Sequence, residues 1–109
     1  MTDFKNGSVK IANEIVDQLI AESALKVEGV DSVIGYKNQK VDYKKKEGIV
    51  SIIDNGKMEV ALSLILDGNS NIYETCESVQ KNVQEQLDVM LGLDVTKVNI
   101  VVKDVNYNN

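Results

Sequence analysis

Histidine, arginine, proline and tryptophan are all absent from this chain of 109 residues, and cysteine occurs once. Without histidine, the chain lacks the side chain that enzymes most often use as a general base at neutral pH. Without arginine, it lacks the planar fork that reads guanine edges and clamps phosphates. The net charge of −5 repels polyanions and anionic lipid. We therefore expect no nucleic-acid partner.

Extended apolar segments are also missing. The most apolar run, residues 60–66, is far shorter than the roughly 20 residues that a membrane-spanning helix needs. The start of the chain shows no charged segment followed by an apolar one, and a lone cysteine forms no internal disulfide. We expect a cytoplasmic protein without direct membrane insertion, which reaches a membrane only through a partner. Its length suits a single domain over residues 1–109 with one two-layer core.

The clearest pattern is the alternation of apolar residues in the second half of the chain. Every second residue after Lys57 is large and apolar, which predicts a strand with one buried face. The inward residues are Met58, Val60, Leu62, Leu64 and Leu66. A short apolar run at residues 49–53 precedes it, and Asn55-Gly56 between them is typical of a two-residue hairpin turn. These two strands should therefore pair antiparallel.

A punctuated helix follows. Asn71 with Glu74 three residues later predicts its N-terminus, and Gly92 predicts its end. Apolar residues at helical spacing predict the buried row: Ile72, Cys76, Val79, Val83, Leu87 and Met90. Residues 95–105 then alternate again, with Val98, Ile100 and Val102 on one face. A right-handed crossover through the helix makes this strand parallel to the earlier one.

The first half repeats this layout less clearly. Residues 7–11 predict a short strand, and the following helix has two apolar rows, Ile11, Ile15, Leu19 and Ala12, Val16, Ile20, Ala24. Asn13, Glu14, Asp17, Gln18 and Glu22 fall on the opposite, solvent-facing side, and Gly29 is a plausible end. Residues 30–36 predict another strand. The fold class is therefore α+β, a two-layer sandwich in β-α-β-β-β-α-β order, with a mixed sheet of about four strands and two amphipathic helices on one face.

No set of residues forms a convincing catalytic or metal site. Cys76 has no histidine to act as its base and lies on the predicted buried row, so a core thiol is the better interpretation, although its place in the first helical turn could lower its pKa. Asp67, Asn69 and Asn71 resemble the start of a calcium loop, but Ser78 stands where the ligating glutamate is required. We expect no catalytic residue, metal or cofactor.

Two surfaces remain as candidates for interaction. The outward face of the predicted sheet is small and partly apolar, which favours burial against a partner, although an ordinary exposed sheet face is equally compatible. Its residues are Ala61, Ser63, Ile65, Asn99, Val101 and Lys103. The second candidate is a lysine-rich segment with Tyr36 and Tyr43 interleaved, although a solvated loop is the better interpretation of such a charge run. Its lysines are Lys37, Lys40, Lys44, Lys45 and Lys46.

Several short motifs resemble the alkaline shock protein family of Gram-positive bacteria. They are GSVKI at 7–11, EIV at 14–16, VEGV at 27–30, IYE at 72–74, VQ at 79–80, GL at 92–93 and VTKVNIVV at 95–102. The resemblance covers nearly the whole chain. It implies a small stress-response protein of cell-envelope homeostasis that self-associates and, in some members, is recruited by a membrane-anchor protein, and it supplies no catalytic residues.

The sequence therefore favours a non-enzymatic interaction or scaffold protein. We expect it to act by self-association and by docking other proteins, through the open sheet face and the lysine-rich segment. The alternative is a regulatory α+β domain that binds a small molecule at an oligomer interface. A buried pocket with convergent polar groups would favour that alternative, and a close-packed core would count against it.

Overall fold

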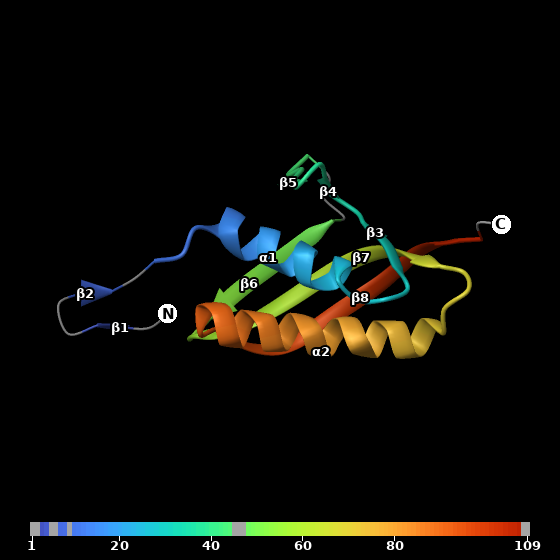
Figure 1. Cartoon of the computed structure of the whole chain (residues 1–109). Coiled ribbons are helices and arrows are strands. Elements are labelled where there is room, and N and C mark those ends of the chain that lie inside the picture. The colour runs from blue at the N-terminus through green and yellow to red at the C-terminus, as the bar shows by residue number, and fades with distance from the viewer. Residues whose placement is uncertain (1–2, 5–6, 9, 45–47, 108–109) are drawn as a thin grey trace.

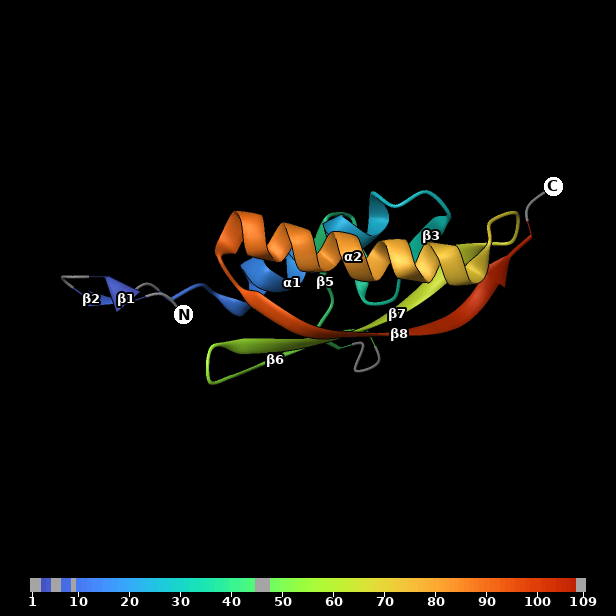
Figure 2. The ribbon, with the colours of Figure 1, turned by 90° about the horizontal axis from the view of Figure 1, so that it is seen from below.

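A computed structural model describes residues 3–4, 7–8, 10–44 and 48–107. Its main body has two layers, a four-stranded sheet and a pair of helices that cover one face of it, as Figure 2 shows. The helices are α1 (Asn13–Leu25) and α2 (Ile72–Leu91). The strands are β3 (Val30–Val33), β6 (Ile49–Asp54), β7 (Lys57–Asp67) and β8 (Asp94–Asn106). The predicted α+β sandwich is confirmed.

Strand β7 is the centre of the sheet (Figure 1). Along one side it pairs in parallel with β8 over its whole length. Along the other side it pairs antiparallel with two strands in succession, β6 over its first half and β3 near its end. The parallel pairing of β7 with β8 across α2 and the antiparallel pairing with β6 are both as predicted.

The core lies between β7 and the two helices. The five predicted inward residues of β7 are all at most 1% exposed. Val16, Ile20 and Ala24 from α1 and Val79, Val83 and Leu87 from α2 are equally buried against them. One predicted row of α1 is thus confirmed except at Ala12, which precedes the helix and is exposed, whereas Ile15 of the other row is 57% exposed. The reason is that α1 faces the sheet through a narrower stripe than two full rows would need.

Helix α2 begins and ends where the sequence indicates. The side-chain oxygen of Asn71 accepts a hydrogen bond of 3.1 Å from the backbone N–H of Glu74, and Gly92 closes the helix at a φ of +66°. Its predicted buried row was too long, because Ile72 is 38% and Met90 is 61% exposed. A spacing of 3.6 residues per turn carries the ends of a long row away from the sheet. Thr75 is buried near the helix start, with its side chain next to Gly29.

Two pairs of short strands are separate from the main sheet. Of the strand predicted over 7–11, the structure gives β2 (Gly7–Ser8), which pairs with β1 (Asp3–Phe4) away from the main body in Figure 1, while residue 9 lies outside the described residues. The sheet therefore contains one β-α-β crossover, where the sequence layout suggested two. The predicted strand over 30–36 also divides, because Tyr36 belongs to β4 (Tyr36–Lys37), which forms a separate hairpin with β5 (Lys40–Val41).

Candidate functional site: an open sheet face and a lysine hairpin

The sheet face opposite the helices is only partly as predicted. Val101 is 50% exposed and Asn99 is exposed, while Ala61 and Ile65 are half-buried. Ser63 points outward but is only 5% exposed, so it contributes little accessible surface. The backbone of Ser63 forms hydrogen bonds to two segments on the same side of β7. Its N–H donates to the carbonyl of Gly48, and its carbonyl accepts from the N–H of Ile34.

Lys103 occupies an irregular position in β8. Leu64 of β7 is opposite Val102, and the next residue, Ile65, is opposite Asp104, so Lys103 is an extra residue in β8. Such a bulge interrupts the alternation of the strand. Asp104 therefore takes the position beside Ile65 that the alternation had assigned to Lys103.

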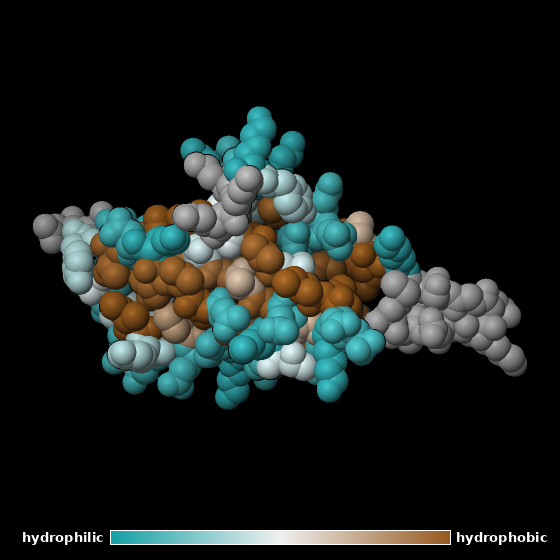
Figure 3. Space-filling view, turned by 180° about the vertical axis from the view of Figure 1, so that it is seen from behind, coloured by the Kyte–Doolittle hydropathy of each residue, from teal (hydrophilic) through white to brown (hydrophobic). Residues whose placement is uncertain are grey.

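Strand β6 adds two exposed aliphatic side chains that sequence reasoning missed. Val50 is opposite Ala61 and is 43% exposed, and Ile52 is opposite Glu59 and is 60% exposed. Figure 3 shows this side of the molecule, with apolar surface along its middle and polar side chains along its borders. We name the aliphatic surface formed by Val50, Ile52, Ala61, Ile65 and Val101 the open face. The two-residue turn at Asn55-Gly56 fixes the pairing of Asp54 with Lys57. This register could have predicted that Val50 and Ile52 face outward.

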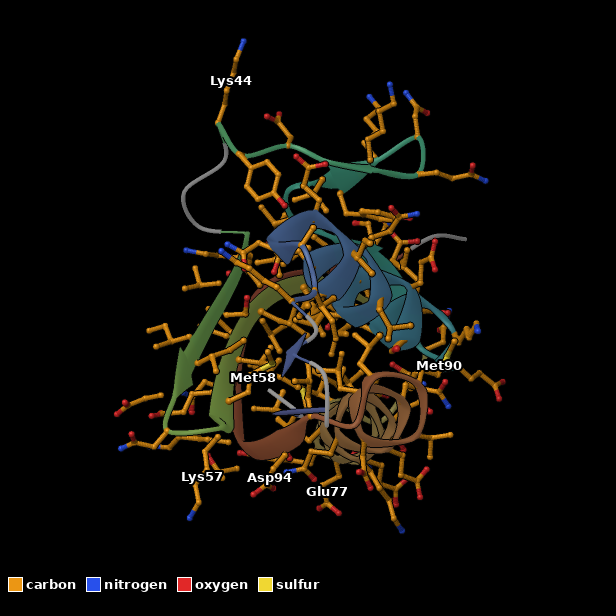
Figure 4. All side chains as sticks on the ribbon, turned by 90° about the vertical axis from the view of Figure 1, so that its left-hand side faces the viewer. Lys44, Lys57, Met58, Glu77, Met90 and Asp94 are labelled. Atoms are coloured by element: carbon orange, nitrogen blue, oxygen red, sulfur yellow. The ribbon has the colours of Figure 1, made fainter. Side chains whose placement is uncertain are left out.

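The first part of the lysine-rich segment is the β4–β5 hairpin rather than an irregular loop. Lys37 and Lys40 are direct cross-strand partners in the β4–β5 hairpin, and the turn between them holds Asn38 and Gln39 at φ angles of +54° and +63°. Like charges directly opposite one another are destabilising. Figure 4 shows Lys44 projecting from the body beyond this hairpin. Lys45 and Lys46 lie outside the described residues.

Two tyrosines fasten the hairpin to α1. The hydroxyl of Tyr36 donates to Glu22 over 3.2 Å, and that of Tyr43 donates to Asp17 over 3.0 Å. Partial burial and the neighbouring Glu22 carboxylate raise the pKa of Tyr36. We name residues 36–44 the lysine hairpin. Its lysines are thus held in a fixed place relative to the main body.

Asp17 was predicted to face solvent and is instead 5% exposed. Its two carboxylate oxygens accept separate hydrogen bonds, one from Tyr43 and one of 2.9 Å from the hydroxyl of Ser51. Ser51 lies on the helix side of β6, opposite the buried Val60. Ser51, a polar residue at an inward strand position, was the sequence feature that could have indicated the burial of Asp17, because a buried carboxylate requires a hydrogen-bond donor.

The Tyr43 phenol should titrate at unusually high pH. Partial burial, the hydrogen bond to Asp17 and the charge of Asp17 raise the pKa of Tyr43 from 10.0 to about 12. Because the folded-state pKa is raised, the stabilisation from this contact is complete below pH 10 and is lost as the pH rises towards 12. Ultraviolet titration of the wild type and of Tyr43→Phe should give a difference curve with its midpoint near 12. A midpoint near 10 would contradict the raised pKa, and Asp17→Ala should lower the midpoint only in part, because burial of the phenol still raises the pKa.

The Cys76 thiol is not activated. It is half-buried on α2, and burial raises its pKa. The expectation that the start of the helix could lower this pKa is therefore wrong, because loss of solvation raises the pKa. Among the described residues, no three cysteine or acidic side chains gather as a metal site.

A polar groove lies between the end of α1 and the first turns of α2. It has a volume of about 840 Å³ and is open to solvent. Charged side chains of both signs line it, including Lys26, Glu28, Glu74 and Lys81. No helix within the described ranges is long and apolar enough to cross a membrane.

Comparison with known proteins identifies a family and a fold. A family model for the alkaline shock protein 23 family, described as having a cell envelope-related function, matches residues 1–107 and confirms the resemblance seen in the motifs. No curated protein matches the chain. Among solved structures, a zinc form of a MamM CTD variant is 14% identical with a TM-score of 0.54, covering 87% of this chain and 88% of its own. A cadmium form of another variant is also 14% identical with a TM-score of 0.53, covering 90% and 100%. At this identity the likeness shows a shared fold.

Proposed function

Because this chain belongs to the alkaline shock protein 23 family, whose function is cell envelope-related, we propose that it is a non-enzymatic interaction module of envelope homeostasis. It acts by self-association and by docking other proteins. Its site of action is the cytoplasm, and it reaches the membrane through a membrane-anchor protein. The surfaces that dock other proteins are the open face and the lysine hairpin.

The observation that carries the proposal is the exposure of aliphatic side chains on the open face. Val50, Ile52 and Val101 are between 43% and 60% exposed, and they come from β6 and β8, the two strands that flank β7. Both helices lie on the other side of the sheet (Figure 2). Contiguous apolar surface rimmed by polar residues is typical of a protein interaction site.

The lysine hairpin supports the same function by a different chemistry. It pairs Lys37 with Lys40 and ends at the exposed Lys44, on a chain whose net charge is −5. The hydrogen bonds of Tyr36 and Tyr43 hold it against α1, so its lysines are presented in a defined position. An acidic protein surface is the partner that this charge arrangement favours.

The chemistry of the side chains supports a non-enzymatic role. The chain has no histidine, and the pKa of its single thiol is raised rather than lowered. The alternative of a small-molecule regulatory domain would use the groove between the helices. That groove is open and lined mainly by polar groups, whereas small-molecule pockets are mostly apolar and enclose their ligand.

Val101→Lys should greatly reduce recovery of partner proteins from native cells. The substitution places a charge on the open face at a position that is 50% exposed, so the fold should tolerate it. The matched control is Val89→Lys on α2, where the same residue type is 80% exposed on a different surface. Thermal unfolding of both variants checks that they fold. Equal partner recovery with wild type and Val101→Lys would show that the open face is not the docking site.

A further inference from the structure

The two outer edges of the main sheet differ in how their backbone groups are bonded. At the β8 edge, side chains from α2 reach the backbone: the amide of Gln80 donates to the carbonyl of Val98 over 3.1 Å, and that of Gln84 donates to the carbonyl of Val95 over 3.4 Å. A sheet edge with unpaired backbone groups is a template for another strand. The two glutamine side chains therefore hydrogen-bond backbone carbonyls in the first part of β8.

At the β6 edge, alternate backbone groups point away from β7. Asp54 and Lys57 flank a two-residue turn, so they form a hydrogen-bonded pair, and the groups of Val50 and Ile52 point towards β7 in the same way. The N–H and C=O groups of the alternate residues therefore point away from β7. These residues are Ile49, Ser51 and Ile53. No strand within the described residues pairs with this edge.

The side chains of β6 make this edge unusually apolar. Ile52 on the open face and Ile53 on the helix side are 60% and 50% exposed, so aliphatic groups flank the free backbone on both faces of the strand. Natural edge strands are normally protected by lysine, proline or a bulge. β6 contains no lysine or proline, and its pairing with β7 is regular over all six residues.

We propose that the β6 edge is the dimerisation site of this protein, where a second copy pairs its own β6 antiparallel about Ser51. The proposal rests on the self-association part of the proposed function and names its contact. A two-fold axis perpendicular to the sheet places each residue opposite one that shares its face. Ile49 then lies opposite Ile53 of the second copy, and Val50 lies opposite its Ile52.

The sequence of β6 selects this register. With Ser51 on the axis, each exposed aliphatic side chain meets another, and Asp54 lies opposite Gly48. A register centred on Ile52 would place Asp54 against Val50, and one centred on Val50 would leave Ile53 unpaired. β6 is thus self-complementary, which favours a second copy over an unrelated strand. The dimer joins two sheets edge to edge and brings two open faces side by side.

The register can be tested with single cysteines in a Cys76→Ala background. Val50 and Ile52 point their backbone groups towards β7, so across the new contact they form a non-hydrogen-bonded pair with Cα atoms about 4.5 Å apart, within disulfide reach. Under mild oxidation, Val50→Cys mixed with Ile52→Cys should form a covalent dimer, and each variant alone should not. Cross-linking of either variant alone to the same extent, or of neither sample, would overturn the Ser51-centred pairing.

Sedimentation supplies an independent readout. Ile53→Lys should convert the dimer to a monomer, whereas Ile15→Lys, the same change at a residue of α1 that is 57% exposed, should leave it intact. Val101→Lys should also stay dimeric, so loss of partner recovery in that variant reports on the docking function and not on the β6 contact. A wild-type protein that is monomeric at high concentration would overturn the dimer while leaving partner docking open to its own test.

Discussion

Replacing Leu64 with alanine is expected to lower the free energy of unfolding by about 3 to 5 kcal/mol. Leu64 is 0% exposed and lies where both β3 and β8 flank β7, opposite Val33 and Val102. Strands on both sides limit how far the backbone can relax into the space left by the side chain. The loss therefore includes a cavity contribution as well as the transfer of the missing methyl groups. Urea unfolding of wild type and variant measures the difference.

Leu25→Ala is the matched control for this substitution. Leu25 ends α1 and is 37% exposed, so the same change removes less buried surface and leaves no enclosed cavity. Its effect should be clearly smaller. If the two variants were destabilised equally, the core would not be centred on the inward side chains of β7.

Replacing Asp17 with alanine should cost about 2 to 3 kcal/mol, because the change removes two hydrogen bonds to a charged acceptor. It separates α1 from the Ser51 hydroxyl and from Tyr43. The Tyr43 hydroxyl belongs to a residue that is 54% exposed and can bond water, whereas the Ser51 hydroxyl points to the helix side. The larger part of the lost stability should therefore come from the hydrogen bond to Ser51 of β6.

A double-mutant cycle locates this contribution. Asp17→Ala and Ser51→Ala should be less damaging together than the sum of the two single changes, because both remove the same hydrogen bond. Gln18→Ala, at the next and exposed position of α1, should change stability by less than about 0.5 kcal/mol. Strict additivity of Asp17→Ala and Ser51→Ala would contradict the contact.

The fold was predictable where one face of an element is buried along its whole length. The alternation of β7 and the capping residues Asn71 and Gly92 each act locally, so their geometry follows from the residues themselves. The separate β1–β2 pair was not predictable in the same way. Residues 7–11 were predicted as one short strand, but which sheet a short strand joins depends on contacts distant in sequence.

The candidate surfaces were less predictable because they depend on exact register. The bulge at Lys103 moves one charge without any glycine to mark it. Asp17 looks like an ordinary exposed helix residue until the inward position of Ser51 is known. Val50 and Ile52 lie in a continuous apolar run, which indicates a strand but not which residues face outward. Pairing across the Asn55-Gly56 turn resolves that question.

The central position of β7 restricts how this protein can change in length. β7 is bonded to β8 on one side and to β6 and β3 on the other, so an inserted residue would shift its register against three strands at once. It would also turn the following inward side chains to the opposite face. The Asn38–Gln39 and Asn55–Gly56 turns each join only two strands. Natural length variation in relatives should therefore collect at these turns and leave β7 at a constant length.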